Sequence, residues 1–203
     1  MIEPGFGEPD GAKVIGQWGD VRIEVAPRDA VTVVAALAIV AMFTREADAD
    51  GPRGGLKHLD EALNGALLRL RSDGIFMASA GELLTLSAVA PPIRANDIIA
   101  VGLGDPDMFT PAILRRAVSH AAEEAIRLCA PSAAFAPSLL DSGIDHTLLP
   151  GVEEAMLGGL IDALAARATH GIALSCWIFC AGAEHLDAVA ASFRDALLRF
   201  DRR

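Results

Sequence analysis

Acidic side chains are the first candidates for chemistry in this sequence, and their spacing argues against a catalytic cluster. A hydrolase that uses two metal ions needs several carboxylates within about 4 Å of the cations. Asp105 and Asp107 form a close carboxylate pair after a predicted strand. Because Thr110 and Pro111 begin a helix directly behind them, the pair is typical of negative charge at a helix N-terminus. The sequence therefore predicts no metal site, no cofactor and no catalytic residue.

The histidines and the remaining acid pairs point the same way. None of the five histidines stands with Cys, Ser and Asp residues in a spacing typical of nucleophilic catalysis. His58, early in a predicted helix, and His146, in a long predicted loop, could reach the mouth of a pocket, with an ordinary surface position as the alternative. Glu123-Glu124 and Glu153-Glu154 fall on the outer faces of predicted helices, which indicates solvated surface.

Glycine-containing segments lie where a parallel sheet would bind a ligand. Helix N-termini and exposed backbone N–H groups attract phosphate, and open parallel sheets bind ligands beyond the carboxyl ends of their strands. The alternative is that these glycines serve only tight turns, and the full GxGxxG spacing is absent. The predicted ligand-binding set is Gly54, Gly55, His58, Gly102, Gly104, Asp105, Ser138 and Gly143.

Cys176 and Cys180 lie four residues apart in a predicted strand, so their side chains share one face. A zinc pair is one interpretation. Structural zinc takes four ligands, however, and no second Cys/His pair at ligand spacing accompanies these two. We therefore predict buried, reduced thiols.

The balance of charge restricts the partners. There are 17 Lys and Arg residues against 27 Asp and Glu, a formal net charge of −10. The negative electrostatic field of such a surface repels phosphate backbones, so we expect no nucleic-acid partner. The first residues, MIEPGFGEPDG, are unlike a signal sequence, and the apolar run at residues 30–43 is shorter than the roughly 20 residues of a membrane helix. We expect a cytoplasmic protein with no membrane contact.

Apolar patterning supplies the elements that would position these residues. It predicts strands at residues 20–25, 35–43, 82–89, 97–104, 132–136 and 172–180, and helices at 56–74, 110–129, from 150 and at 184–200. Repeated strand-then-helix order with apolar strands predicts an α/β fold, a three-layer α-β-α sandwich with a mixed, largely parallel sheet. The length suits one domain, which we place at residues 20–203 behind an extended N-terminal segment, 1–19.

Three blocks of the sequence match the pattern of one protein family. They are GGLKHLDEALNGALLRL at residues 54–70, the following loop and strand up to GELLTL at 81–86, and IIAVGLGDPDMFTPAILRRA at 98–117. Together they resemble the N-terminal, non-catalytic domain of the leucyl aminopeptidase (cytosol aminopeptidase) family. The middle block departs from it, because Met77-Ala-Ser-Ala80 replaces a small, basic stretch after Phe76.

The resemblance implies a macro-domain-like fold, and residues 173–200 are similar to the last strand and helix of macro domains. We therefore expect a complete domain that stands alone. The resemblance places the family's metal ions, lysine, arginine and bridging carboxylates in a second domain, which this sequence lacks.

The function implied by the resemblance is a non-catalytic interaction or regulatory domain. One alternative is a macro-type binder or hydrolase of a nucleotide or ADP-ribose derivative, so a phosphate-containing small ligand stays open. Against it, Ala41-Met-Phe-Thr-Arg45 replaces the asparagine-rich motif of macro domains, and we expect no response to ADP-ribose. A second alternative is a subunit that docks onto a separately encoded peptidase, its protein partner.

We also expect a homo-oligomer. The expectation rests on Phe6, Trp18 and Phe109, which fall in predicted turns or in the N-terminal tail. Apolar side chains gathered on a surface usually mark an interface.

Overall fold

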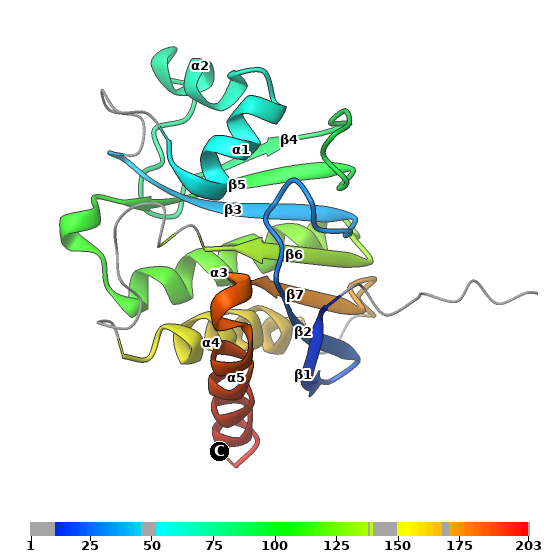
Figure 1. The fold of residues 1–203 in the computed structure, drawn as a ribbon. Coiled ribbons are helices and arrows are strands. Elements are labelled where there is room, and N and C mark those ends of the chain that lie inside the picture. Colours follow the sequence, from blue (N-terminus) through cyan, green and yellow to red (C-terminus); the bar gives the residue numbers. More distant parts are fainter. Residues whose placement is uncertain (1–10, 46–51, 138, 140–149, 168–170, 203) are drawn as a thin grey trace, which may run out of the picture.

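The structure is a computed structural model that describes residues 11–45, 52–137, 139, 150–167 and 171–202. Within these residues, seven strands form one sheet in the order β1-β2-β7-β6-β3-β5-β4 (Figure 1). Strands β2, β7, β6, β3 and β5 run parallel, and β1 and β4 pair antiparallel at the edges. The carboxyl ends of the five parallel strands therefore meet at one edge of the sheet. The strands are β1 Lys13–Trp18, β2 Val21–Ala26, β3 Leu37–Phe43, β4 Leu83–Leu86, β5 Asp97–Gly104, β6 Ser132–Ala136 and β7 Cys176–Cys180.

Helices cover both faces of this sheet. Helices α3, α4 and α5 pack on one face, and α1 and α2, together with the segment that joins β2 to β3, pack on the other. The predicted three-layer α/β sandwich with a mixed, largely parallel sheet is thereby confirmed. The helices are α1 Gly54–Ala62, α2 Ala66–Ser72, α3 Pro111–Arg127, α4 Val152–Ala166 and α5 Leu186–Phe200, with short 3-10 turns η1 Pro106–Met108 and η3 Ala183–His185.

Strand β3 shows why both faces of the sheet have to be covered by other elements. All seven of its residues are buried. Ile39 and Phe43 contribute to one core, whereas Val40 and Met42 point to the other. A strand without a polar face can lie only in the interior of a sheet that is covered on both sides.

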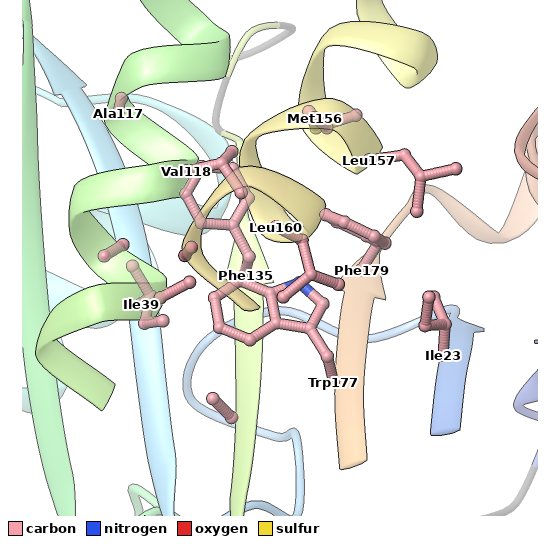
Figure 2. Packing of buried hydrophobic residues seen from close by; sticks show 14 of the residues in the cluster. Ile23, Ile39, Ala117, Val118, Phe135, Met156, Leu157, Leu160, Trp177 and Phe179 are labelled. Atoms are coloured by element: carbon pink, nitrogen blue, oxygen red, sulfur yellow. The ribbon is translucent and has the colours of Figure 1, made fainter. Parts of the chain in front are cut away.

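The core beneath α4 and α5 is built around aromatic side chains of β6 and β7. Phe135, Trp177 and Phe179 lie together under α4 (Figure 2). The rings of Phe179 and Phe193 stack with their centroids 4.4 Å apart, which fixes α5 against the sheet. Offset stacking of this kind adds to the free energy gained by burial alone.

The start of α3 follows the predicted capping chemistry. The Thr110 side chain accepts a hydrogen bond from the Ile113 backbone N–H, and Pro111 occupies the first turn. Threonine satisfies an N–H that the helix leaves unpaired, and proline loses no helical hydrogen bond there.

The single helix predicted at residues 56–74 was wrong, because the chain forms two helices there. Asn64 and Gly65 adopt positive φ values of 54° and 77°, which end α1 and turn the chain. Asp60, only 6% exposed, accepts a hydrogen bond from the backbone N–H of Leu67, 3.0 Å away, in the first turn of α2. The leucine spacing continues across the turn and conceals it.

The starting points of two strand regions differ from the prediction. Residues 13–18 form β1 and pair with β2, so the sheet includes residues before position 20. Strand β7 begins at Cys176 rather than at residue 172.

The argument for a homo-oligomer finds no support in these positions. Trp18 and Phe109 pack against the main core, and Phe109 meets Phe43 edge-on with ring centroids 5.2 Å apart. Phe6 lies outside the described residues. The homo-oligomer stays a prediction. None of the described helices has the length and apolar character needed to cross a membrane.

The cysteines separate into one exposed and two buried thiols. We expect a bulky thiol reagent to label Cys129 rapidly in the native protein and Cys176 and Cys180 only on unfolding. Burial raises the pKa of Cys180 to about 12, so its reactive thiolate form is scarce at neutral pH. Mass spectrometry of native and denatured protein measures the sites, and rapid native labelling of all three would contradict the buried assignment.

Candidate ligand-binding site

A cavity of about 420 Å³ opens at the carboxyl ends of β2, β6 and β7. The segments that leave these strands form much of its wall, and the first turns of α1 and α4 complete it. Most of the described lining residues are apolar, and the ionisable groups among them are Asp29, Arg28, Glu153, His185 and the thiol of Cys180. The lining residues are Pro27, Arg28, Asp29, Ala30, Thr32, Val40, Gly55, Ala136, Pro137, Leu139, Val152, Glu153, Met156, Cys180, Ala181, Gly182, Ala183, His185, Val189 and Phe193.

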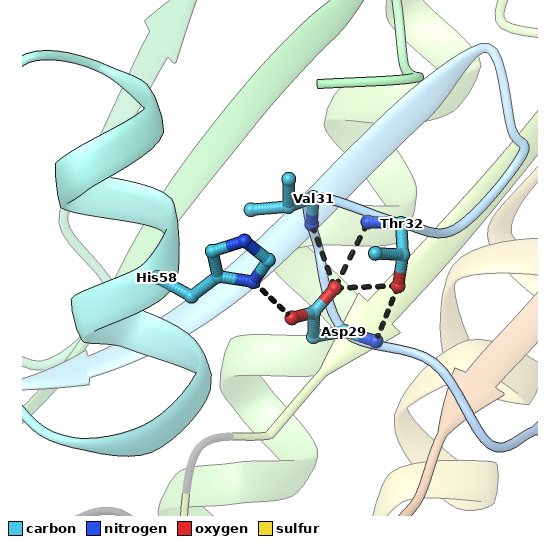
Figure 3. A network of polar contacts seen from close by, with 4 residues as sticks. All are labelled: Asp29, Val31, Thr32 and His58. Atoms are coloured by element: carbon cyan, nitrogen blue, oxygen red, sulfur yellow. Dashed lines mark hydrogen bonds and ion pairs between the residues drawn. The ribbon is translucent and has the colours of Figure 1, made fainter. Parts of the chain in front are cut away.

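Asp29 is held in one orientation by its own turn and by α1 (Figure 3). Its Oδ1 accepts hydrogen bonds from the Thr32 hydroxyl at 2.6 Å and from the backbone N–H groups of Thr32 at 2.9 Å and Val31 at 3.2 Å. Its Oδ2 lies 2.6 Å from His58 Nδ1. Because a carboxylate only accepts, Nδ1 carries the proton. A carboxylate with this many donors is fixed before any ligand arrives.

The same contacts set the charge of Asp29. Burial by itself would raise its pKa, but hydrogen bonds from Thr32 and His58 outweigh that effect, and the pKa lies below its ordinary value. Donors favour the charged form of a carboxyl group. The cavity wall therefore carries a negative charge at neutral pH.

Cys180 supplies the thiol of the wall. Its side chain is 7% exposed, and no hydrogen bond joins it to another of the described residues. Burial, with a smaller effect of the Asp29 charge, raises its pKa to about 12. At neutral pH it remains a neutral thiol.

The structure divides the predicted site residues between two places. Gly55 lines the cavity, and Gly54 precedes it in the first turn of α1. His58 reaches the site through Asp29. Ser138 and Gly143 lie outside the described residues.

Gly102, Gly104 and Asp105 lie at the end of β5 and do not line the cavity. The backbone N–H of Gly102 donates to the carbonyl oxygen of Glu82 at 2.8 Å, and that of Gly104 donates to the carbonyl oxygen of Ala78 at 2.9 Å. Asp105 accepts from the backbone N–H of Asp107 at 2.9 Å and pairs with Arg45. The two glycines and this carboxylate are thus occupied by the protein's own groups.

Sequence reasoning missed the most constrained polar group of the site. Asp29 with Thr32 is the spacing of a turn in which the Asp side chain caps following backbone N–H groups, and that local signal was available. Glu153, which the sequence analysis interpreted as solvated surface, also lines the cavity. Within the described ranges, no three His, Cys, Asp or Glu side chains lie close enough together to hold a metal ion.

Comparison with solved structures defines the class of fold. A mutant of the Oceanobacillus iheyensis macrodomain matches with a TM-score of 0.67 and 15% identity, covering 97% of this chain and 97% of that chain. A Trypanosoma brucei macrodomain in complex with ADP-ribose gives 0.64 and 17%, covering 91% and 74%. A mutant of tomato leucine aminopeptidase gives 0.69 and 19%, covering 94% of this chain but only 36% of the enzyme. The chain thus has a macrodomain-like fold and spans about a third of the tomato enzyme.

The family follows from the sequence. A model of the N-terminal domain of the cytosol aminopeptidase family matches residues 39–159, more than half of the chain. This chain belongs to the cytosol aminopeptidase family, and the part of the family that it matches is the N-terminal domain. No curated protein matches the sequence.

The close approach at Gly102 predicts a large effect of one methyl group. A Cβ at this position would lie 2.0 Å from the carbonyl oxygen of Ser79. We expect Gly102→Ala to lower the free energy of unfolding by about 1–3 kcal/mol or more, as overpacking does. Gly182→Ala is the control, because a Cβ at Gly182 has no neighbour within 4 Å. Equal urea midpoints for the two variants would contradict the packing described.

The lowered pKa of Asp29 predicts that its contribution to the free energy of unfolding depends on pH. Its pKa is depressed in the folded state, so its stabilising effect is present above the unfolded pKa of about 3.9 and is lost as pH falls through the folded pKa. We expect Asp29→Ala to cost about 1–3 kcal/mol at neutral pH. The difference from the wild type, measured by denaturant titration, should shrink below a pH of about 4. A difference that is constant with pH would show that the charge does not matter.

Proposed function

We propose that this chain is a non-catalytic binding domain, whose cavity holds a small ligand that regulates its interactions. The observation that carries the proposal is the cavity at the carboxyl ends of β2, β6 and β7, with the pre-oriented carboxylate of Asp29 in its wall. Its volume of about 420 Å³ falls in the range of small-molecule sites. Open parallel sheets bind ligands at this edge.

The similarity of fold bears on the class of ligand. The Trypanosoma brucei macrodomain is described in complex with ADP-ribose, and this chain shares its fold at 17% identity. A nucleotide or ADP-ribose derivative is therefore the alternative ligand class that a binding experiment has to include. The shared fold and the cavity at the carboxyl ends of the strands both support ligand binding.

A non-catalytic role is supported by how the reactive groups are engaged. Hydrogen bonds from Thr32 and His58 hold the pKa of Asp29 below its ordinary value, and the Cys180 thiol has a pKa of about 12. A general base or nucleophile needs a pKa nearer to neutral. Docking onto a separately encoded peptidase, a homo-oligomeric state and a cytoplasmic location remain further predictions.

Filling the cavity tests the proposal. We expect a panel of nucleosides, nucleotides, ADP-ribose and small amines to contain at least one compound that raises the melting temperature saturably. The gain is about 2.7 kcal/mol at a hundredfold excess over the Kd. Gly182→Trp should abolish the shift, because Gly182 lines the cavity and its Cβ position is open.

Gly171→Trp is the matched control. A Cβ at Gly171 also has no neighbour within 4 Å, and Gly171 does not line the cavity. The shift should persist in this variant. A shift that survives in Gly182→Trp, or a panel without any binder, would refute the proposed function.

A further inference from the structure

The described segments at the edge of the sheet where the cavity opens carry few basic side chains. These segments follow the five parallel strands and comprise residues 27–36, 44–45, 52–53, 105–110, 137, 139, 150–151 and 181–185. They contain no lysine, and their arginines are Arg28, Arg45 and Arg53. Their acidic residues are Asp29, Asp105, Asp107 and Glu184.

The described wall of the cavity holds more carboxylates than permanent positive charges. It contains two carboxylates, Asp29 and Glu153, one guanidinium, Arg28, and one imidazole, His185. Arg45, a second arginine of this edge, pairs with Asp105 and Asp107 at the end of β5. A phosphate that entered would meet a surplus of like charge, which costs free energy in a partly buried site.

The donors expected to bind phosphate are also reduced in number. The backbone N–H groups of Gly102 and Gly104 already donate hydrogen bonds to the carbonyl oxygens of Glu82 and Ala78. The first turn of α4 carries its own carboxylates, Glu153 and Glu154. Negative side chains at a helix N-terminus take up the favourable interaction that a bound anion would otherwise gain.

The hydrogen bonds of Asp29 leave room for a donor from a ligand. Its Oδ1 accepts three donors within the protein, whereas its Oδ2 accepts one, from His58. A carboxylate oxygen accepts about two hydrogen bonds, so Oδ2 retains an acceptor site. The cavity wall also includes the apolar side chains of Val40, Met156 and Phe193.

We propose that the cavity binds a small organic cation, an ammonium group on an apolar body, and discriminates against phosphorylated ligands. The ammonium donates to Asp29 Oδ2, Glu153 adds a second negative charge, and the apolar body replaces water against the aliphatic and aromatic wall. This inference rests on the proposed function and names its ligand class. A charge-assisted hydrogen bond at a partly buried site is stronger than a neutral one, which gives the selectivity.

Ligands that share one apolar body and differ in charge provide the test. Benzylamine, benzyl alcohol and benzyl phosphate are titrated into the full chain by calorimetry, with ADP-ribose alongside. We expect benzylamine to bind about tenfold or more tightly than benzyl alcohol, from one charge-assisted hydrogen bond. The advantage should fall as ionic strength rises, and benzyl phosphate should bind more weakly than the alcohol.

Charge-neutralising variants locate the effect. Asp29→Asn should bring the affinity for benzylamine to about that for benzyl alcohol measured with the same variant. Glu153→Gln, which leaves the hydrogen bonds of Asp29 in place, should reduce the same preference by a smaller factor. Glu123→Gln changes the net charge equally on the exposed surface of α3 and should leave the preference unchanged.

The outcomes separate this inference from the proposed function. Benzyl phosphate or ADP-ribose binding more tightly than benzylamine, with loss of binding in Gly182→Trp, would overturn the cation inference and support the binding domain. Equal affinities for the amine and the alcohol, or no binding of the amine, would also overturn it. No binding by any compound of either panel would remove both.

Discussion

The central strands carry apolar side chains on both faces, and this constraint determines the rest of the structure. Strands β3 and β7 are buried along their whole length, so neither face of the sheet there can meet water. Helices have to cover both sides, and the parallel order brings the carboxyl ends of the five parallel strands to the same edge. At that edge the strands end and helices begin, so backbone turns and helix starts gather around one cavity. A place for a ligand is therefore a consequence of how the core is buried.

Asp29 shows how this edge acquires a defined polar group. Its turn binds Oδ1 through Thr32 and Val31, and α1 brings His58 to Oδ2 from the other side. A buried carboxyl group without donors would become neutral. The donors keep it charged and oriented, so the same contacts that stabilise the turn give the cavity its electrostatic character.

The chain combines a family fold with strand-following segments whose sequence is rich in Asp and Glu. Its match to the cytosol aminopeptidase family and its likeness to macrodomains concern the sheet and its helices. These features depend on buried apolar residues, which tolerate exchange if volume and pattern are kept. The segments after the strands are free of that restriction, and here they are rich in Asp and Glu. Shared architecture and a different ligand are therefore compatible.

The sequence by itself determined the strands and helices whose signals are local: the apolar runs of β3, β5 and β6 and the Thr110-Pro111 start of α3. It did not reveal the turn at Gly65, because the leucine spacing runs on across it, nor the pairing of β1. Only the tertiary structure decided which glycines could meet a ligand. Gly55 and Gly102 look alike in sequence, yet Gly55 lines the cavity and Gly102 lies against the backbone of Ser79. The contact that separates them joins residues far apart in the chain, and no local pattern records such a contact.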